Sequence, residues 1–252
     1  MNNIRVIAWR ELKTLFLSPV AWSVLAIVQL IFAFLFLSQI ETFNLLQPKL
    51  ATIEHAPGLT DIVVIPLFGN AGLILMLVTP LLTMRTVSEE RRNKTLALLL
   101  SAPVTSAEIV LGKYLSVTTL LLIIVALTAI MPLSLLIGGT LDIGKFAANV
   151  LALSMLVLAF ASVGVFMSCL AGTPTLAAMG SFGVLLLLWI VDWSAGMRDQ
   201  HSELFEYLSI LRHYQTIQTG LLASDDVLYF IFFTIGFLLL SCSRLALDRL
   251  QK

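Results

Sequence analysis

The sequence predicts an all-α membrane protein with six transmembrane helices, and three observations support that fold class. Hydrophobic residues make up 59% of the 252 residues, and charged residues make up only 12%. The mean hydropathy is +0.99. Such a chain has too little polar side-chain surface to cover a soluble domain. The apolar residues are also gathered into six long stretches, so we expect lipid to surround most of the surface.

Each stretch is long enough to cross a membrane. A helix rises about 1.5 Å per residue and must cross roughly 30 Å of hydrocarbon, which takes about 20 apolar residues. The stretches cover residues 20–40, 62–84, 115–137, 146–170, 175–191 and 227–242, within one domain that spans residues 1–252.

Lysine and arginine are unevenly shared between the two sides of this layout. Cytoplasmic loops carry the excess of these residues, so the richer side is predicted to be cytoplasmic and to hold both termini. The richer side has Arg5, Arg10, Lys13, Arg85, Arg91, Arg92, Lys94, Lys113, Arg244, Arg249 and Lys252, and the other side has Lys49, Lys145, Arg198 and Arg212.

Residues 1–19 predict an amphipathic helix that lies in the membrane interface. Arg10 and Lys13 fall opposite its apolar arc, and Arg5 and Glu11 lie at the edges of that arc. Ser18-Pro19 is expected to end this helix and to begin the first span, because proline is tolerated in a first turn. A plain membrane anchor would have the same pattern. The apolar arc consists of Ile4, Ala8, Leu12, Leu15 and Phe16.

The segment between the second and third spans, residues 85–113, is the most informative part of the chain. Ser88 is a candidate N-cap, and Glu89 and Glu90 suit the positive end of a helix dipole. The residues that follow turn apolar, so one short helix is predicted for residues 88–101. Thr105 and Glu108 have the spacing of a capping box, which predicts the start of the third spanning helix. An ordinary positively charged loop would share several of these features.

Two outer loops are long. Residues 41–61 contain Pro48, Pro57 and Gly58 and are expected to be mostly irregular. Residues 192–226 carry apolar residues at helical spacing, which predicts one or two short helices in the outer interface.

Catalytic patterns are not evident in the sequence. A P-loop needs glycines, a lysine and a hydroxyl at fixed offsets, and the nearest approach, residues 107–114, lacks the first glycine and the hydroxyl. We therefore expect no catalytic residue, no metal site and no cofactor in this chain. His55, His201 and His213 are far apart and lack the helical spacing of a metal site, so each is expected to be an ordinary surface or interface histidine. Without a basic stripe, nucleic acid is not an expected partner.

Alternative functions remain open at this stage. The six stretches have no ionisable residue at their centres, where a secondary transporter or channel places some. A membrane scaffold that only recruits partners would share every feature described above. A membrane enzyme would need a cluster of acidic residues and histidine near the membrane surface. The candidates for that cluster are Asp192, Asp199, His201, Glu203 and Glu206.

Two regions of the chain resemble ABC-2 type transporter permeases, the membrane subunits of ATP-binding cassette transporters. The first region comprises Glu89-Glu90-Arg91, residues 95–100, Ala102-Pro103-Val104 and residues 108–113. Together with residues 10–13 and Ser18-Pro19, it is similar to the gliding-motility, GldF-type branch. The chain departs from the common family pattern Gly-Thr-Leu-Glu at residues 94–97, which read Lys-Thr-Leu-Ala.

The resemblance implies a six-span exporter subunit in the bacterial cytoplasmic membrane. Two permeases, identical or homologous, would pair with two cytoplasmic ATPase subunits that use ATP and magnesium. The loop after the second span would be a coupling helix that contacts the ATPase, and residues 171–174 would be a weaker contact. Residues 205–222 would form external helices. The coupling residues implied are Glu89, Glu90, Arg91, Arg92, Thr95 and Leu96, with Arg10, Glu11 and Lys13 nearby.

Small and mildly polar residues in the first and fifth stretches predict a dimer face that borders the cargo path. Small residues let helices approach closely in lipid, where packing drives association. The resemblance also places these two stretches near the face between permeases. Packing within one subunit is the alternative. The residues concerned are Ser23, Gln29, Ala177, Gly180 and Gly183.

Overall fold

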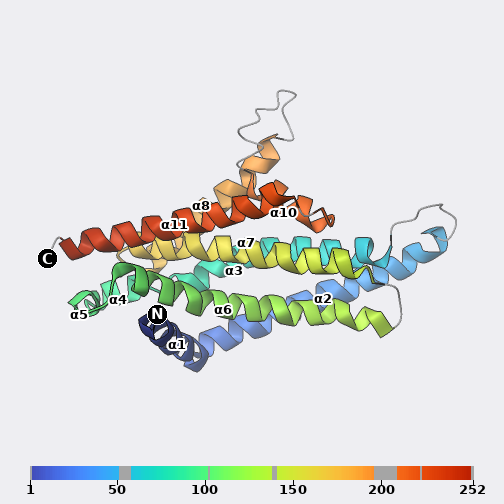
Figure 1. Ribbon diagram of the computed structural model, residues 1–252. Helices are drawn as coiled ribbons and strands as arrows, with labels where there is room; N and C mark the ends of the chain where they lie inside the picture. The colour runs from blue at the N-terminus through green and yellow to red at the C-terminus, as the bar shows by residue number, and fades with distance from the viewer. Residues whose placement is uncertain are drawn as a thin grey trace.

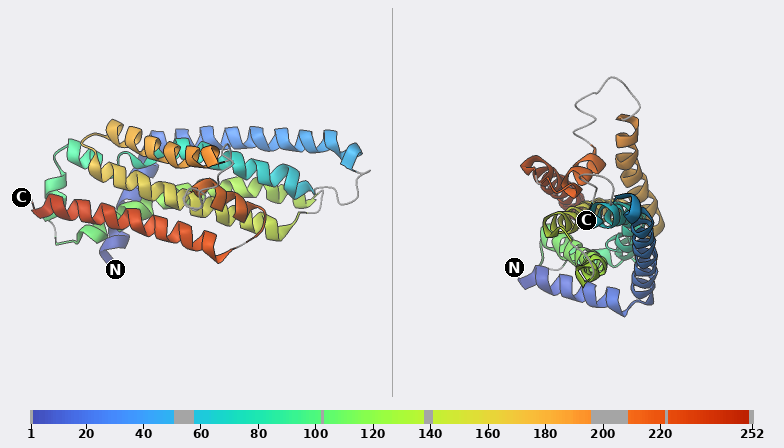
Figure 2. Two further views of the ribbon diagram at one scale, coloured as in Figure 1. Left: turned by 90° about the horizontal axis from the view of Figure 1, so that it is seen from above. Right: turned by 90° about the vertical axis from the view of Figure 1, so that its right-hand side faces the viewer.

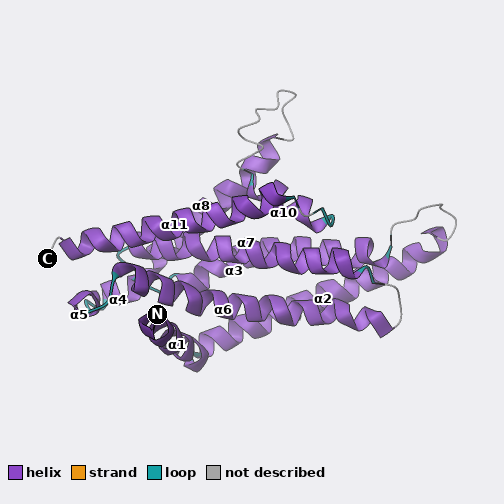
Figure 3. Ribbon diagram, in the orientation of Figure 1, coloured by secondary structure: helices purple, strands orange, loops and turns teal. Residues whose placement is uncertain are grey.

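Helices form all the regular structure of the described residues, and these contain no strand (Figure 3). The computed structural model describes residues 2–50, 58–101, 103–137, 141–195, 209–221 and 223–250. Most of the candidates for a membrane-enzyme cluster lie outside these ranges, namely residues 199, 201, 203 and 206. The side chain of residue 192 is not described either.

Five long helices run side by side and form the body of the molecule (Figures 1 and 2). Five of the described helical segments are long and apolar enough to cross a membrane, so the chain is a multi-pass membrane protein. These segments contain α2 (Pro19–Leu50), α3 (Ile65–Thr83), α6 (Ser106–Leu133), α7 (Ile143–Leu170) and α11 (Ser224–Leu250).

The predicted fifth span corresponds to α8 (Pro174–Ala195), whose described apolar part, Pro174–Ile190, is shorter than the other five. This helix contacts α4 (Ser88–Arg92) and α10 (Ile210–Gln218). Since α4 and α10 lie at opposite ends of the bundle, α8 carries the chain from one end toward the other (Figure 1).

The short helices gather at the two ends. At the end that carries α4, here named the α4 end, lie α1 (Asn2–Leu17), α5 (Leu96–Ser101) and the C-terminal part of α11 (Figure 1). Helix α1 crosses the long helices at a steep angle (Figure 2) and packs mainly on α6. The break predicted at Ser18-Pro19 is confirmed, because α1 ends at Leu17 and α2 begins at Pro19.

Helix α7 is the centre of the packing. It contacts α3, α6, α8, α10 and α11, and its residues Ala152, Leu153, Leu156, Val157 and Phe160 are fully buried. The closest approach is at Gly164, where an added Cβ would lie 2.1 Å from Thr83 Oγ1 on α3. Only a glycine therefore fits where α3 and α7 cross.

The first outer loop is less irregular than predicted. Helix α2 continues to Leu50, so the prediction of irregular structure is wrong for residues 41–50. Pro48 lies inside the last turn of α2, where its missing N–H removes the helical hydrogen bond to the carbonyl four residues earlier. A π-helical turn, η1 (Thr60–Val64), leads into α3, and a 3₁₀ turn, η2 (Ser134–Ile137), follows α6.

Helix α10 is the described part of the predicted external helices, and it packs against the bundle. The Tyr214 hydroxyl donates to the Phe68 carbonyl at 2.6 Å, and Asn149 Nδ2 donates to the Gln218 carbonyl at 3.0 Å. His213 Nδ1 lies 2.5 Å from Asp226 Oδ1, and its ring stacks on Tyr229. His213 is buried where α10 packs on the bundle, so of the two predicted environments, surface or interface, the surface is excluded.

Candidate functional site

Charged and polar side chains from five helices meet around α4, which was predicted to be part of the coupling segment. They come from α1, α4, α6, α7 and α11, and they tie the short helix into the α4 end of the bundle. The site divides into a cap at the start of α4 and two ion-pair centres beyond it.

The start of α4 is capped from another helix. Ser168 Oγ, at the end of α7, accepts hydrogen bonds from the backbone N–H groups of Val87 and Ser88, both at 3.0 Å, and donates to the Met84 carbonyl at 3.1 Å. The prediction that Ser88 is the N-cap is wrong, because Ser88 is the first helical residue and its hydroxyl donates to the Met84 carbonyl. Side chains can satisfy the free amides of a helix start whatever their distance along the chain.

The first ion-pair centre surrounds Lys113 on α6. Its Nζ lies 2.9 Å from Glu90 Oε1 on α4 and 3.1 Å from Glu11 Oε1 on α1, and only 2% of its side chain is exposed. Arg10 Nη2 lies 2.9 Å from the same oxygen of Glu11. Burial disfavours the charge on Glu11, but Lys113 and Arg10 outweigh it and lower the pKa of Glu11. Charges of alternating sign therefore run from the surface of α1 to α4.

The second centre links α4 to the last turns of α11. Arg91 Nη2 donates to the Cys169 carbonyl at 2.8 Å and pairs with Asp248. Asp248 also pairs with Arg244 at 3.2 Å, one turn earlier on α11. The apolar stretch predicted for this span ends at residue 242, so these residues belong to a helical extension beyond it.

The segment after α4 bends sharply. Lys94 has a φ of +59°, and α4 and α5 are separate helices, so the prediction of one helix over residues 88–101 is wrong. Glycine adopts this left-handed conformation without steric cost, whereas a side chain disfavours it. Residue 94 is the position at which this chain has lysine where the resembling family commonly has glycine.

The predicted coupling residues fall into two groups. Glu90 and Arg91 point into the two ion-pair centres, Glu11 contacts Lys113, and Leu96 is buried. Arg10, Lys13 and Thr95 are exposed. The side chains of Glu89 and Arg92 are 38% and 54% exposed and pair loosely at 3.7 Å. These two residues, Thr95 and the 73% exposed Leu98 are exposed positions of the two helices and their connection, here together named the α4–α5 surface.

The residues predicted for a dimer face also differ in exposure. Ala177 is fully buried within the subunit and is not available to a partner. Gln29 Nε2 donates to the Ile124 carbonyl of α6 at 3.0 Å, so it packs within the subunit. Ser23 is exposed, and an added Cβ at Gly183 would meet no atom within 4 Å. At Gly180 it would lie 3.3 Å from Met167 Sδ.

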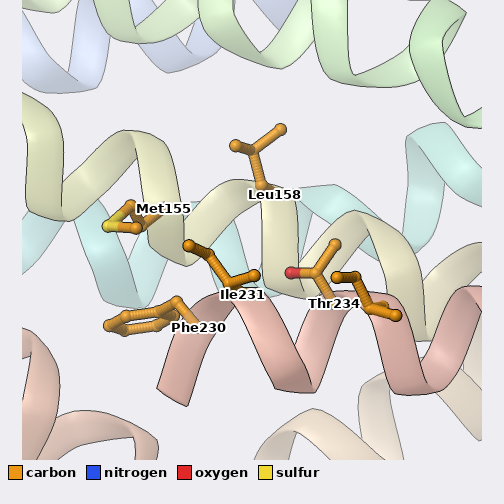
Figure 4. A pocket seen from close by; sticks show the side chains of 6 residues that line it. Met155, Leu158, Phe230, Ile231 and Thr234 are labelled. Atoms are coloured by element: carbon orange, nitrogen blue, oxygen red, sulfur yellow. The ribbon is translucent and has the colours of Figure 1, made fainter. Parts of the chain in front are cut away.

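An open pocket of about 160 Å³ lies between α7 and α11 (Figure 4). Its single polar lining side chain, Thr234, gives it no catalytic group, and the described residues contain no cluster of three potential metal ligands. Its apolar lining consists of Met155, Leu158, Phe230, Ile231 and Ile235.

Comparison with known proteins shows the family of the chain. The model of the family described as "ABC-2 family transporter protein" matches residues 5–246, nearly the whole chain. No curated protein matches the chain. Such permeases work with an ATPase partner, and the match spans both α1 and the α4–α5 segment. The chain therefore belongs to the ABC-2 transporter family.

Proposed function

We propose that this chain is the membrane subunit of an ATP-driven exporter in the bacterial cytoplasmic membrane. Two such permeases would work with two copies of a separate cytoplasmic ATPase, which would use ATP and magnesium. The family match over residues 5–246 carries this proposal. The chain itself would bind no cofactor and hydrolyse no ATP, since its sequence lacks a P-loop.

The proposed layout has six spans with both termini in the cytoplasm, and the direction of the chain supports it. The end of α7 and the end of α11 both lie beside α4, because Arg91 contacts Cys169 and Asp248. Residue 213 lies beside the start of α11 at the other end. The chain must return between these points, and α8 is the helix that does so. The excess of lysine and arginine near α4 supports a cytoplasmic location for the α4 end.

The α4–α5 surface is the proposed contact with the ATPase. It combines an exposed apolar side chain, Leu98, with the exposed charges of Glu89 and Arg92. At the cytoplasmic end, lipid does not cover Leu98, whereas a groove on a partner protein can. Glu90 and Arg91 hold the surface in place from inside.

Leu98→Asp tests this contact directly, in a permease purified together with its ATPase subunit. A charge placed at the apolar centre of an interface should weaken binding at least about tenfold, or roughly 1.4 kcal/mol. Leu221→Asp, at an exposed leucine near α10, is the matched control and should leave binding unchanged. If the Leu98→Asp permease keeps its ATPase subunits, the α4–α5 surface is not the contact.

The double variant Glu89→Lys with Arg92→Glu tests whether the charges of the α4–α5 surface contribute to the contact. It keeps the local pair and the net charge but inverts the charge pattern that faces the partner. Glu90 is unsuitable for this purpose, because reversing it would also break its ion pair with Lys113. The swap should reduce the ATP hydrolysis stimulated by the permease without reducing membrane insertion.

A further inference from the structure

Lys113 is the most buried charged side chain at the α4 end. Its ammonium group contacts one carboxylate from α1 and one from α4, while its own backbone belongs to α6. In the sequence, Glu11 lies 102 positions before Lys113, and Glu90 lies 23 positions before it. A single side chain thus joins three elements.

The neighbouring residue explains why α1 can reach Lys113. An added Cβ at Gly112 would lie 2.7 Å from Ile7 Cγ2 and 3.2 Å from the Ile4 carbonyl oxygen. The glycine therefore lets α1 pack directly on α6, and this contact brings Glu11 within reach of Lys113. Asn3 Nδ2 donates to Glu108 Oε1 at 3.2 Å one turn earlier on α6.

The contact between α1 and α4 depends on the ammonium group of Lys113, because the other two charges of the site have the same sign. Glu11 and Glu90 both lie within hydrogen-bond distance of one nitrogen, so without it two carboxylates would face each other. Like charges in a partly buried site repel strongly. Arg10 balances Glu11 from the surface but lies on the same helix, so it does not link α1 to α4.

We propose that Lys113 is a positioning residue that makes α1 and α4 move as one unit with α6 when the ATPase acts on the α4–α5 surface. The inference rests on the proposed function, since it concerns how a push on α4 reaches the rest of the bundle. Glu90 receives the displacement on α4, Lys113 carries it to α6, and Glu11 carries it to α1. The interfacial helix then follows the coupling segment instead of remaining fixed in the membrane surface.

Spin labels at Thr14 on α1 and Asn93 at the end of α4 measure this link, since both positions are exposed. The background lacks Cys169 and Cys242, and pulsed dipolar spectroscopy gives the distance between the labels. The permease is measured alone in lipid nanodiscs and in complex with its ATPase, without nucleotide and trapped with ATP and vanadate. In the native sequence we expect one narrow distance distribution that trapping leaves unchanged.

The decisive variant combines Lys113→Met with Glu11→Gln and Glu90→Gln. It removes the link without leaving an unpaired buried charge, so it should insert and fold where Lys113→Met alone would not. We expect a broadened distance distribution that shifts on trapping, and loss of the ATP hydrolysis stimulated by the permease, while the bound ATPase subunits are retained. The single variant Lys113→Arg, with Glu11 and Glu90 unchanged, should keep the narrow distribution. Arg5→Met removes an exposed cation from α1 and is the matched control.

The outcomes separate the two proposals. A triple variant that kept both the narrow distribution and the stimulated hydrolysis would overturn the role of Lys113. A broadened distribution in the triple variant with unchanged stimulation would overturn it as well, because the link would then be structural only. A native permease that bound no ATPase would overturn the proposed function, and this inference with it, whatever the distances showed.

Discussion

Ser168 shows how much one hydroxyl contributes to the α4 end. It satisfies two backbone donors and one backbone acceptor of the segment from Met84 to Ser88, and it is fully buried. Buried amides without a partner cost about 1–3 kcal/mol each. The conformation of the α3–α4 turn therefore depends on a residue of α7.

Replacing Ser168 by alanine should loosen this turn. We expect a loss of roughly 1–2 kcal/mol of stability, as for the removal of a helix cap, and faster hydrogen exchange at the amides of Val87 and Ser88. Ser162→Ala is the control, because Ser162 is equally buried on α7 but its hydroxyl donates only to the Ala159 carbonyl of its own helix. Equal exchange rates in the two variants would contradict the capping role of Ser168.

At the residue scale, the sequence predicted what depends on local spacing. The capping box of Thr105 and Glu108 is confirmed, with Glu108 N–H donating to Thr105 Oγ1 at 3.2 Å and Thr105 N–H donating to Glu108 Oε2 at 2.8 Å. The contacts of Ser168 and Lys113 join distant parts of the chain, and no local pattern indicates them. Gly112 was noted only as part of an incomplete P-loop and of the family resemblance, and Lys113 was noted there and among the basic residues of the predicted cytoplasmic side.

At the scale of the helices, hydropathy located the apolar stretches but not the helix ends. Helix α6 begins at Ser106, nine residues before the predicted span, and α11 continues to Leu250. An apolar stretch marks only the part of a helix that lipid surrounds. The polar extensions are held by ion pairs, such as Lys113 with Glu90 and Asp248 with Arg91, that the composition of a single stretch does not reveal.

The crossing of α3 and α7 gives a prediction at this scale. Gly164→Ala would place a Cβ 2.1 Å from Thr83 Oγ1 and 2.6 Å from Thr83 Cβ, so the two helices must separate. We expect a loss of roughly 1–3 kcal/mol, typical of overpacking, seen as a lower melting temperature in detergent. Gly69→Ala on α3 is the control, because an added Cβ there meets nothing within 4 Å. Equal melting temperatures for both variants would contradict the close crossing.

Across the whole molecule, the long helices differ in how far their own subunit covers them. Within the most apolar part of each spanning segment, 61% of the residues of α7 are buried, against 22% of those of α2 and 17% of those of α11. Helix α8 also has an exposed face. Lipid covers such faces in a monomer, and a second permease covers one of them in the proposed dimer. Because Ala177 is buried, its side of α8 cannot face a second permease. The proposed dimer face therefore lies on the opposite side of α8.

Cysteine crosslinking along α8 tests the proposed dimer face. The exposed arc contains Leu176, Met179, Leu187 and Ile190, with Gly183 between them, whereas Ala177, Ser181 and Leu185 point into the subunit. In a background without Cys169 and Cys242, single cysteines on the exposed arc should crosslink two permeases in native membranes, and those on the inner arc should not. The same arc would border the cargo path, because two bundles that meet along α8 enclose a space that one bundle lacks.

Helix α11 provides the competing surface, since Phe232 and Leu239 are equally exposed. Strong crosslinks at these two positions, with none along α8, would move the interface to α11 and overturn the proposed assembly.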